Sequence, residues 1–415
     1  MDKKIDLDFI KKTGKLSNRC LVGYGKNVKH KQSTKRIIKM PCSHEHIRNV
    51  IITHFENDVR TNLDRHLGYI YSINYKTGYY KRTDYLDTTL KPLGSDVFAA
   101  NFPHLIDVGI MGHCTHGKTG LCLKSGVQCY QNGANIQKPN MLLEDFKSIA
   151  EQCKDLIFQF ALGGRGDPNE HEYFGEILRI CRDNHIIPNY TTSGFGLTDE
   201  QIKLTKEYCG AVAVSWYRND YTLSSIKRFI NAGVKTNIHY VLNVDTICEA
   251  IDMLQTNSFP IGINAVVFLT HKPVGLGQKE KCLKFEMPEV QEMFRLIKKG
   301  GYSFKIGIDG CFVVGLINSK LGFNMEYLDT CEATRFTCYI DADMKMHPCS
   351  FDVDNKYIID LKKYNIIEAW NSDLFKSLRQ RLQKGCPGCK FNKLCMGGCF
   401  LHEDIVLCPN KTKGE

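Results

Sequence analysis

The sequence predicts an α/β protein in which a parallel sheet curls into a full or partial barrel, with a small element before it and a cysteine-rich module after it. Three observations predict this fold. From about residue 101, short apolar segments alternate with helical segments of ten or more residues, as in parallel α/β proteins. Residues 1–100 lack this alternation, and residues 321–415 are turn-rich and heavy in cysteine. A length of 415 residues fits two or three domains.

Six strands are expected in the barrel, and a helical segment follows each of them. The strands are apolar along most of their length, as strands buried on both faces are. In such sheets, functional groups gather at the carboxyl ends of the strands. The expected strands cover residues 104–112, 156–164, 186–194, 210–217, 234–243 and 261–269. The expected helices cover residues 141–153, 172–184, 199–208, 223–233, 246–255 and 287–301.

Residues 1–100 are interpreted as a separate extension. Within it, residues 68–86 alternate in polarity around a central Lys-Thr-Gly, which predicts a hairpin. The formal net charge is +10, and part of it lies in residues 26–39. A basic run is more often a solvated face than a phosphate site, and no nucleic-acid-binding signature accompanies it. Nucleic acid is therefore not an expected partner, whereas an acidic peptide would suit a basic surface.

The chain is expected to be cytoplasmic, because it has neither a signal peptide nor an apolar run of membrane-spanning length. Nineteen cysteines are then a large excess, since disulfides are rare in reducing compartments. Clustered cysteines in such proteins more often bind metal. Four others are interpreted as ordinary small buried residues: Cys153, Cys181, Cys209 and Cys248.

The first cysteine set lies in a Gly-rich loop directly after the first strand. Cys114, Cys122 and Cys129 have the spacing Cys-x7-Cys-x6-Cys. A closed zinc site needs four ligands, and His113 or His116 would supply the fourth. An iron–sulfur cluster can instead take three thiolates and leave one iron free. The spacing alone does not decide between these two sites.

The next three strands end in glycine or polar residues. Glycines at a strand end let a ligand approach the backbone closely, and the second strand ends in Gly-Gly-Arg-Gly-Asp-Pro. The third ends in Thr-Thr-Ser-Gly, and the fourth in Ser-Trp-Tyr-Arg-Asn. These ends meet the cysteine loop at one edge of the sheet, where they predict a ligand site. The residues concerned are Gly163, Gly164, Gly166, Asp167, Thr192, Ser193, Ser215 and Arg218.

The second cysteine set has a more specific pattern. Its second half reads Cys-x2-Cys-x5-Cys-x3-Cys, and the eight thiols make two sets of four with none left over. Zinc bound by four cysteines is the physical alternative to an iron–sulfur cluster here. The eight residues are Cys331, Cys338, Cys349, Cys386, Cys389, Cys395, Cys399 and Cys408.

With these motifs, residues 104–408 resemble radical SAM enzymes that carry a C-terminal SPASM domain and act as peptide maturases. The resemblance implies a partial (β/α)6 barrel over residues 101–320 and a SPASM-like module with auxiliary iron–sulfur clusters over residues 321–415. It also implies a [4Fe–4S] cluster on the loop cysteines, with S-adenosylmethionine on the free iron. Tyr130, after the third cysteine, matches an aromatic that normally lies beside it. The glycine turn, the two polar strand ends and residues 271–277 match cofactor-binding segments, and Asp167 takes the acidic place in the turn.

The SPASM resemblance implies two auxiliary [4Fe–4S] clusters. The turn before Cys349 matches the family pattern except that Met344 stands where the family has glycine, and the first loop departs from the usual Cys-x3-Cys-x2-Cys spacing. By the family scheme, the first cluster takes Cys331, Cys338, Cys349 and Cys399. The second takes Cys386, Cys389, Cys395 and Cys408.

The function implied is that of a radical SAM oxidoreductase. Reductive cleavage of S-adenosylmethionine gives a 5′-deoxyadenosyl radical, which abstracts hydrogen from a peptide or protein substrate. The leading hypothesis is a thioether or carbon–carbon crosslink in a ribosomally made peptide. The expected partners are that substrate and a one-electron reductant of flavodoxin or ferredoxin type. Residues 1–100 either bind a leader segment or pack on the barrel.

Three alternatives stay open. A sulfatase-type formylglycine maturase has an acidic base after the third module cysteine, and Ser350 at that place argues against it. A peptide epimerase needs a thiol that returns hydrogen, and Cys311 with Asp309 as a nearby acid is the candidate pair, although a packed strand cysteine is the commoner case. The third alternative is a zinc-stapled binding protein without catalysis.

Overall fold

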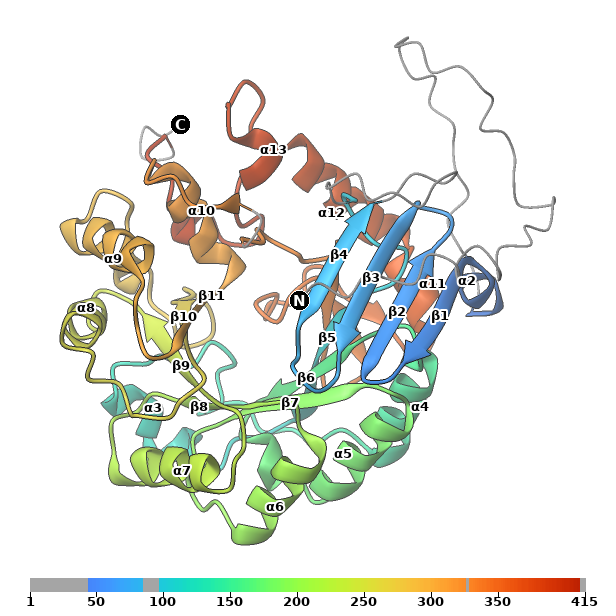
Figure 1. The fold of residues 1–415 in the computed structure, drawn as a ribbon, viewed down its shortest axis with the longest axis horizontal. Coiled ribbons are helices and arrows are strands. Elements are labelled where there is room, and N and C mark those ends of the chain that lie inside the picture. Colours follow the sequence, from blue (N-terminus) through green and yellow to red (C-terminus); the bar gives the residue numbers. More distant parts are fainter. Residues whose placement is uncertain (1–43, 85–96, 326–327, 411–415) are drawn as a thin grey trace.

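The computed structural model describes residues 44–84, 97–325 and 328–410. Their larger sheet has the strand order β11-β10-β9-β8-β7-β6-β5-β12-β13-β14. Its barrel strands are parallel to one another, and the sheet curves with helices α4 to α9 on its outer side (Figure 1). The barrel strands are β5 (Leu105–Met111), β6 (Gln159–Gly164), β7 (Ile187–Thr192), β8 (Val212–Ser215), β9 (Thr236–Leu242), β10 (Ala265–Thr270) and β11 (Lys305–Ile308).

The six strands and six helices predicted from the sequence are confirmed, with ends that differ by a few residues. The seventh strand, β11, was not predicted, because its four residues form no apolar run that stands out from the neighbouring turn. The outer helices are α4 (Leu143–Cys153), α5 (Phe174–Asp183), α6 (Asp199–Tyr208), α7 (Asp220–Asn231), α8 (Ile247–Thr256) and α9 (Pro288–Lys299). No helix of the described ranges is long and apolar enough to cross a membrane.

Strand alternation divides the barrel into an outer and an inner face. Ile106 pairs with Phe160 across β5 and β6, and Phe160 packs against Phe146 of α4 with ring centroids 5.7 Å apart. Ile106 and Phe160 therefore face the helices, and both are fully buried. Asp107 lies on the opposite face of β5 and points into the barrel.

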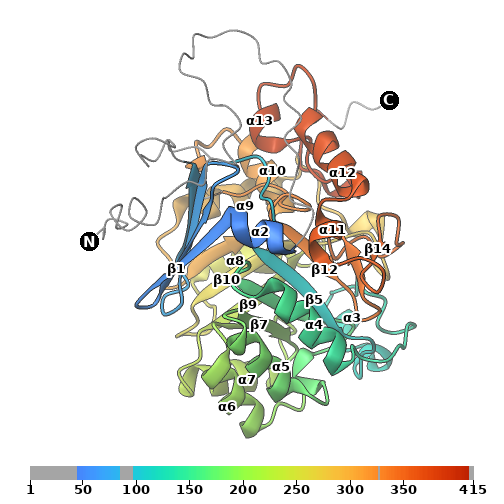
Figure 2. The same cartoon turned by 90° about the vertical axis from the view of Figure 1, so that its right-hand side faces the viewer.

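The C-terminal module joins the barrel at β5. Its first strand, β12 (Thr337–Ile340), pairs in parallel with β5, and Figure 2 shows the module beside that strand. The hairpin strands β13 (Lys345–His347) and β14 (Ile359–Asp360) extend the sheet. The remaining helices of this half are α10 (Gly310–Asn318), α11 (Ile366–Trp370), α12 (Asp373–Lys384) and α13 (Asn392–Cys395). Short 3-10 turns cover Gly117–Thr119, Pro168–Glu170, Lys279–Lys281 and Glu403–Ile405.

The N-terminal part forms a helix and a four-stranded antiparallel sheet. They are α2 (His44–Val50), β1 (Ile51–Glu56), β2 (Val59–Asp64), β3 (Tyr69–Asn74) and β4 (Tyr80–Asp84). The predicted hairpin is confirmed as β3 and β4. The basic run at residues 26–39 lies outside the described residues.

This small sheet closes the amino end of the barrel. Asn62 Nδ2 donates to the carbonyl of Asp155 at 2.8 Å, and Arg60 Nη1 donates to the carbonyl of His185 at 3.0 Å. Arg60 also donates to the carbonyl of Ile157. These carbonyls come just before β6 and β7, so the sheet lies at the end of the barrel opposite the cysteine loop.

We expect Arg60→Met to destabilise the protein by about 2 to 4 kcal/mol, because it leaves buried carbonyls without charged donors. Arg60 is fully buried and its guanidinium lies 4.6 Å from the ring centroid of Phe158. Denaturant titration measures the loss. Lys81→Met, at an exposed position of the same sheet, is the control, and an equal effect of both substitutions would contradict the capping role.

Candidate functional site

The three loop thiols share one space at the carboxyl end of β5. The backbone amide of Gly133 donates to Cys129 Sγ at 3.4 Å, and a Cβ on Gly133 would lie 3.0 Å from Cys114 Cβ. Burial raises the pKa of Cys114 to about 12, and the charges of Cys122, Asp167 and Cys129 act in the same direction. The loop therefore brings the three predicted thiols together, as its spacing alone did not guarantee.

The glycine turn after β6 packs directly on this loop. Gly166 has φ +136°, and a Cβ there would lie 2.4 Å from the carbonyl oxygen of His113. Gly164 has φ +112° and approaches the Met111 carbonyl equally closely. A side chain at either position would push the loop away. A Cβ on Gly163, by contrast, would meet open space, so that position leaves room for a ligand.

Asp167 joins the second and third strand ends. Its Oδ2 accepts hydrogen bonds from Thr192 Oγ1 at 3.0 Å, from the Ser193 amide at 2.8 Å and from Ser193 Oγ at 2.6 Å. His116 Nε2 lies 3.4 Å from the same oxygen. The structure thus brings together Asp167, Thr192 and Ser193. It also turns His116 toward Asp167 and Glu170, which is 3.7 Å away.

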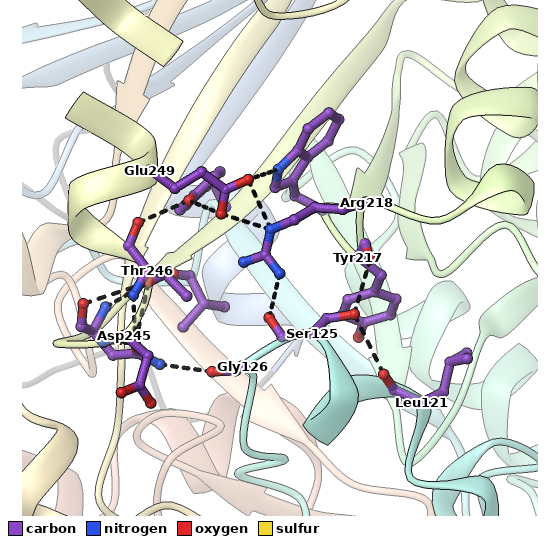
Figure 3. Close-up of polar contacts among 12 residues, drawn as sticks. Leu121, Ser125, Gly126, Tyr217, Arg218, Asp245, Thr246 and Glu249 are labelled. Carbon is purple, nitrogen blue, oxygen red and sulfur yellow. Dashed lines mark hydrogen bonds and ion pairs between the residues drawn. The ribbon is translucent and has the colours of Figure 1, made fainter. Parts of the chain in front are cut away.

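Arg218 holds the far end of the cysteine loop (Figure 3). Its Nε donates to the carboxylate of Glu249 at 2.6 and 2.8 Å, and Nη1 donates to the carbonyl of Ser125 at 2.7 Å. Asn243 Nδ2 donates to the carbonyl of Gly126 at 2.9 Å. The loop helix α3 (Leu121–Lys124) is therefore fixed to the ends of β8 and β9. Arg218 thus contacts the backbone of the cysteine loop and positions that loop.

Two residues of this arrangement were missed by sequence reasoning. The Cys122 thiol donates to Tyr217 Oη at 3.2 Å, and Tyr217 stands between two residues that the strand-end pattern did single out, Ser215 and Arg218. Ser215 is half-buried at the end of β8. Glu249 had no signal, because a glutamate in the first turn of an amphipathic helix is ordinary.

Tyr130 lies between the loop and the module. Its ring centroid is 4.8 Å from that of Phe351, two residues after Cys349, and burial raises its pKa to about 12. The segment 271–277 contacts the same place. Leu276 donates its amide to the carbonyl of Cys129 at 2.9 Å, and a Cβ on Gly275 would lie 2.2 Å from the carbonyl oxygen of Tyr130.

The four cysteines expected at the second auxiliary cluster, called the second module set below, come together as predicted. One cavity of about 30 Å³ is lined by its four thiols, with Asn392 and Phe391 among the other lining residues. The backbone amide of Cys386 donates to Asn392 Oδ1 at 2.6 Å, and Asn392 Nδ2 donates to the carbonyl of Lys384 at 3.0 Å. The thiols of this cavity are Cys386, Cys389, Cys395 and Cys408.

The cysteines expected at the first auxiliary cluster, called the first module set below, differ from the prediction in one member. Cys331 and Cys349 line a cavity of about 620 Å³ together with Cys311, and Cys399 lies close enough to Cys311 for the two thiols to shift each other's pKa. Cys338 lies elsewhere. It pairs with Ile106 across β12 and β5, so it faces the outer helices, where it is 1% exposed. Burial raises the pKa of Cys153 on α4, and Cys338 adds to that shift.

Cys311 therefore takes the place expected for Cys338, and the physical reason is strand alternation. Thr337 and Tyr339 face into the barrel, while Cys338 between them faces the helices. Asp309, expected as an acid beside Cys311, is the N-cap of α10. Its Oδ1 accepts the amide of Phe312 at 3.0 Å.

None of the described cysteines forms a disulfide. No three His, Cys, Asp or Glu side chains in the described ranges converge tightly enough to hold a single metal ion. The thiols instead surround a space, and a multi-iron cluster accepts that arrangement because each thiolate binds a different iron.

Polar groups on the inner face of the barrel form the remaining part of the site. Asp107 is half-buried, its carboxyl group makes no hydrogen bond within the described part of the chain, and burial raises its pKa to about 7. Burial lowers the pKa of His239 to about 4, and its Nδ1 lies 3.2 Å from Thr191 Oγ1. The neighbouring Tyr339 covers Gly109. The interior thus holds a carboxyl group that can exchange a proton near neutral pH.

Comparisons with known proteins agree with this architecture. The family model for SPASM, an iron–sulfur cluster-binding domain, matches residues 331–391. The fold is similar to that of Streptococcus suis SuiB bound to precursor peptide SuiA, with a TM-score of 0.62 and 15% identity over 87% of this chain and 99% of that one. It is also similar to anSMEcpe with bound AdoMet and Cp18Cys peptide, with a TM-score of 0.51 and 17% identity over 74% of this chain and 92% of that one. No curated protein matches the sequence significantly.

At these identities the two solved structures show a similarity of fold only. The family model identifies the iron–sulfur cluster-binding domain within the module. The fold class predicted from the sequence is therefore confirmed, both for the partial barrel and for the SPASM module that follows it.

We expect Cys311→Ala to remove about four irons from the anaerobically reconstituted protein, as loss of one four-iron cluster requires. Cys338→Ala should leave the iron content unchanged, because Cys338 faces the helix layer. Iron and sulfide analysis of both variants is the measurement. Iron loss in Cys338→Ala with full content in Cys311→Ala would restore the ligand set expected from the sequence.

A second expectation concerns Asp107. A carboxyl whose pKa is raised in the folded state stabilises the protein fully only below its unfolded pKa, and this contribution is lost as the pH rises through about 7. Asp107→Asn should therefore gain stability relative to the parent as the pH rises from about 4 to about 7, by at most about 4 kcal/mol in total, and should keep that gain at higher pH. Thermal midpoints across this range measure the gain, and a difference independent of pH would contradict the position of Asp107.

Proposed function

We propose that this chain is a radical SAM enzyme with a SPASM module, and that it modifies a peptide or protein substrate. One observation carries the proposal: three thiols share a space at the carboxyl end of a parallel barrel, against a glycine turn whose backbone touches their loop. Three thiolates suit a four-iron cluster that keeps one iron for a further ligand. S-adenosylmethionine bound there would supply the 5′-deoxyadenosyl radical that takes hydrogen from the substrate.

The surrounding residues are proposed to hold this centre in place. Arg218 and Asn243 fix one end of the loop, and Asp167 fixes the third strand end against it. Gly163 leaves the open space into which a cofactor backbone or amino group fits. Ser215, Thr192 and Ser193 lie at the neighbouring strand ends and are proposed cofactor contacts.

We assign the module thiols to two auxiliary clusters. The cavity lined by Cys386, Cys389, Cys395 and Cys408 supports the second set as predicted. The shared cavity of Cys311, Cys331 and Cys349 supports a first set that contains Cys311, and so does the mutual influence of the Cys311 and Cys399 thiols on their pKa values.

The substrate class is supported by the similar structures. SuiB is bound to a precursor peptide, and anSMEcpe is bound to a peptide. A crosslink in a ribosomally made peptide remains the leading reaction, with an external one-electron reductant of flavodoxin or ferredoxin type. The N-terminal sheet lies at the closed end of the barrel, which favours packing over leader binding for its described residues.

Two alternative reactions fit the site less well. Formylglycine formation needs an acidic residue directly after Cys349, and this chain has Ser350 there. Epimerisation needs a free thiol, and Cys311 lies against Cys399 while Asp309 caps a helix. We propose the Asp107 carboxyl, which points into the barrel and whose pKa burial raises to about 7, as the group that accepts a substrate proton.

We expect the anaerobically purified protein to be brown, to hold about twelve irons in three clusters, and to form 5′-deoxyadenosine from S-adenosylmethionine after reduction with dithionite. The triple variant Cys114→Ala, Cys122→Ala, Cys129→Ala should form none, because the cluster that donates the electron is lost. Liquid chromatography with mass detection measures the product.

The matched control is Cys248→Ala, which should keep the parent activity. Cys248 is exposed on α8, so the expectation that it is buried was wrong. Retained cleavage in the triple variant would refute the site. A colourless parent protein that contains zinc would support the binding module without catalysis.

A further inference from the structure

Lys272 is a buried cation at the junction of barrel and module. It is 3% exposed, and it follows β10 by two residues. Its Nζ donates to Asp309 Oδ2 at 2.8 Å and to the carbonyl of Thr270 at 2.7 Å. It also lies 4.4 Å from the ring centroid of Phe351. A buried ammonium group with an anion and a carbonyl as partners keeps its charge.

These partners place Lys272 beside the first module set. Asp309 precedes Cys311 by two residues, and Phe351 follows Cys349 by two. The thiols act on the ammonium group in return. Burial lowers the pKa of Lys272, but Asp309, Cys311 and Cys349 raise it above its ordinary value. The ammonium group is therefore within electrostatic reach of two thiols from different segments.

The two ends of the ion pair approach the set from different segments. The Lys272 ammonium group lies over the ring of Phe351, two residues after Cys349, and its partner Asp309 lies two residues before Cys311. A positive and a negative charge shift a nearby reduction potential in opposite directions, so removal of either end alone has an effect of defined sign.

We propose that Lys272 is a positioning charge that raises the reduction potential of the first auxiliary cluster, the one held by Cys311, Cys331, Cys349 and Cys399. The proposal rests on the proposed function, because it requires a cluster at these thiols. Adding one electron to a thiolate-bound cluster makes it more negative, and a nearby cation stabilises that reduced form. The cluster is thereby suited to accept the electron that a substrate radical gives up when it is oxidised.

The test is an EPR-monitored redox titration of the full-length, cluster-loaded protein. The background carries the Cys114, Cys122 and Cys129 to Ala substitutions, so that the auxiliary clusters titrate without the loop cluster. Lys272→Met should lower the potential of one cluster by about 59 mV or more, which is a tenfold change in a one-electron equilibrium. The potential of the other cluster should stay constant.

Asp309→Asn should shift the reduction potential in the opposite direction. It removes the negative end of the pair and keeps a good N-cap for α10, so the potential of the same cluster should rise. Lys272→Arg keeps the charge and should restore the parent value. The matched control is Lys298→Met, since Lys298 also lies over an aromatic ring, Phe323 at 5.5 Å, but is exposed.

The outcomes separate the two proposals. A parent protein without iron at the module would refute the proposed function. A loaded Lys272→Met protein with the parent potential would overturn the inference and leave the function standing. Should Lys272→Met fail to bind the cluster, Lys272→Gln should lower the reduction potential and Asp309→Asn should raise it. A lower potential in both of these variants would also overturn the inference.

Discussion

The close contact between two backbones, the cysteine loop and the glycine turn, is the constraint on which the site depends. Gly166 approaches the carbonyl of His113, and Gly164 approaches that of Met111, so closely that a Cβ would lie 2.4 Å away in each case. Both glycines have positive φ, which other residues rarely adopt. Because the turn follows β6 and the loop follows the adjacent β5, this contact fixes the thiols relative to the sheet. Arg218 and Asn243 then fix the other end of the loop.

The order of strands and helices, and the edge at which the site lies, follow from patterns that the sequence shows directly. The second module set was also predictable, because its cysteines fall at short, regular spacings. Cys338 and Cys311 were not distinguishable in this way. A count of thiols cannot say which face of a four-residue strand a cysteine occupies, and β12 takes its register from β5, which lies more than 200 residues earlier in the chain. Cys311 joins Cys399 through a contact that depends on how α10 packs, and no local pattern encodes that.

Several polar residues singled out from the strand ends turned out to bind other parts of the protein. Asp167 accepts hydrogen bonds from Thr192 and Ser193, and Arg218 pairs with Glu249. A sequence shows that a charged residue stands at a functional edge. Whether that residue meets a ligand or a neighbouring loop depends on partners such as Glu249, which lies in the first turn of an outer helix. The same limit explains the N-terminal sheet, whose role as a cap depends on carbonyls of Asp155, Ile157 and His185 that carry no side-chain signal.

Strand β5 unites the parts of the proposed centre. The cysteine loop leaves its carboxyl end, Asp107 points from its inner face into the barrel, and β12 of the module pairs along its free edge. A continuous hydrogen-bonded sheet has little freedom to flex between neighbouring strands, so the spacing between the loop thiols and the module thiols is set by the sheet itself. The Lys272–Asp309 pair adds a second connection, since it joins the end of β10 to the first turn of α10. Two connections, one at β5 and one at β10, therefore hold the module against the barrel more firmly than a flexible linker between domains would.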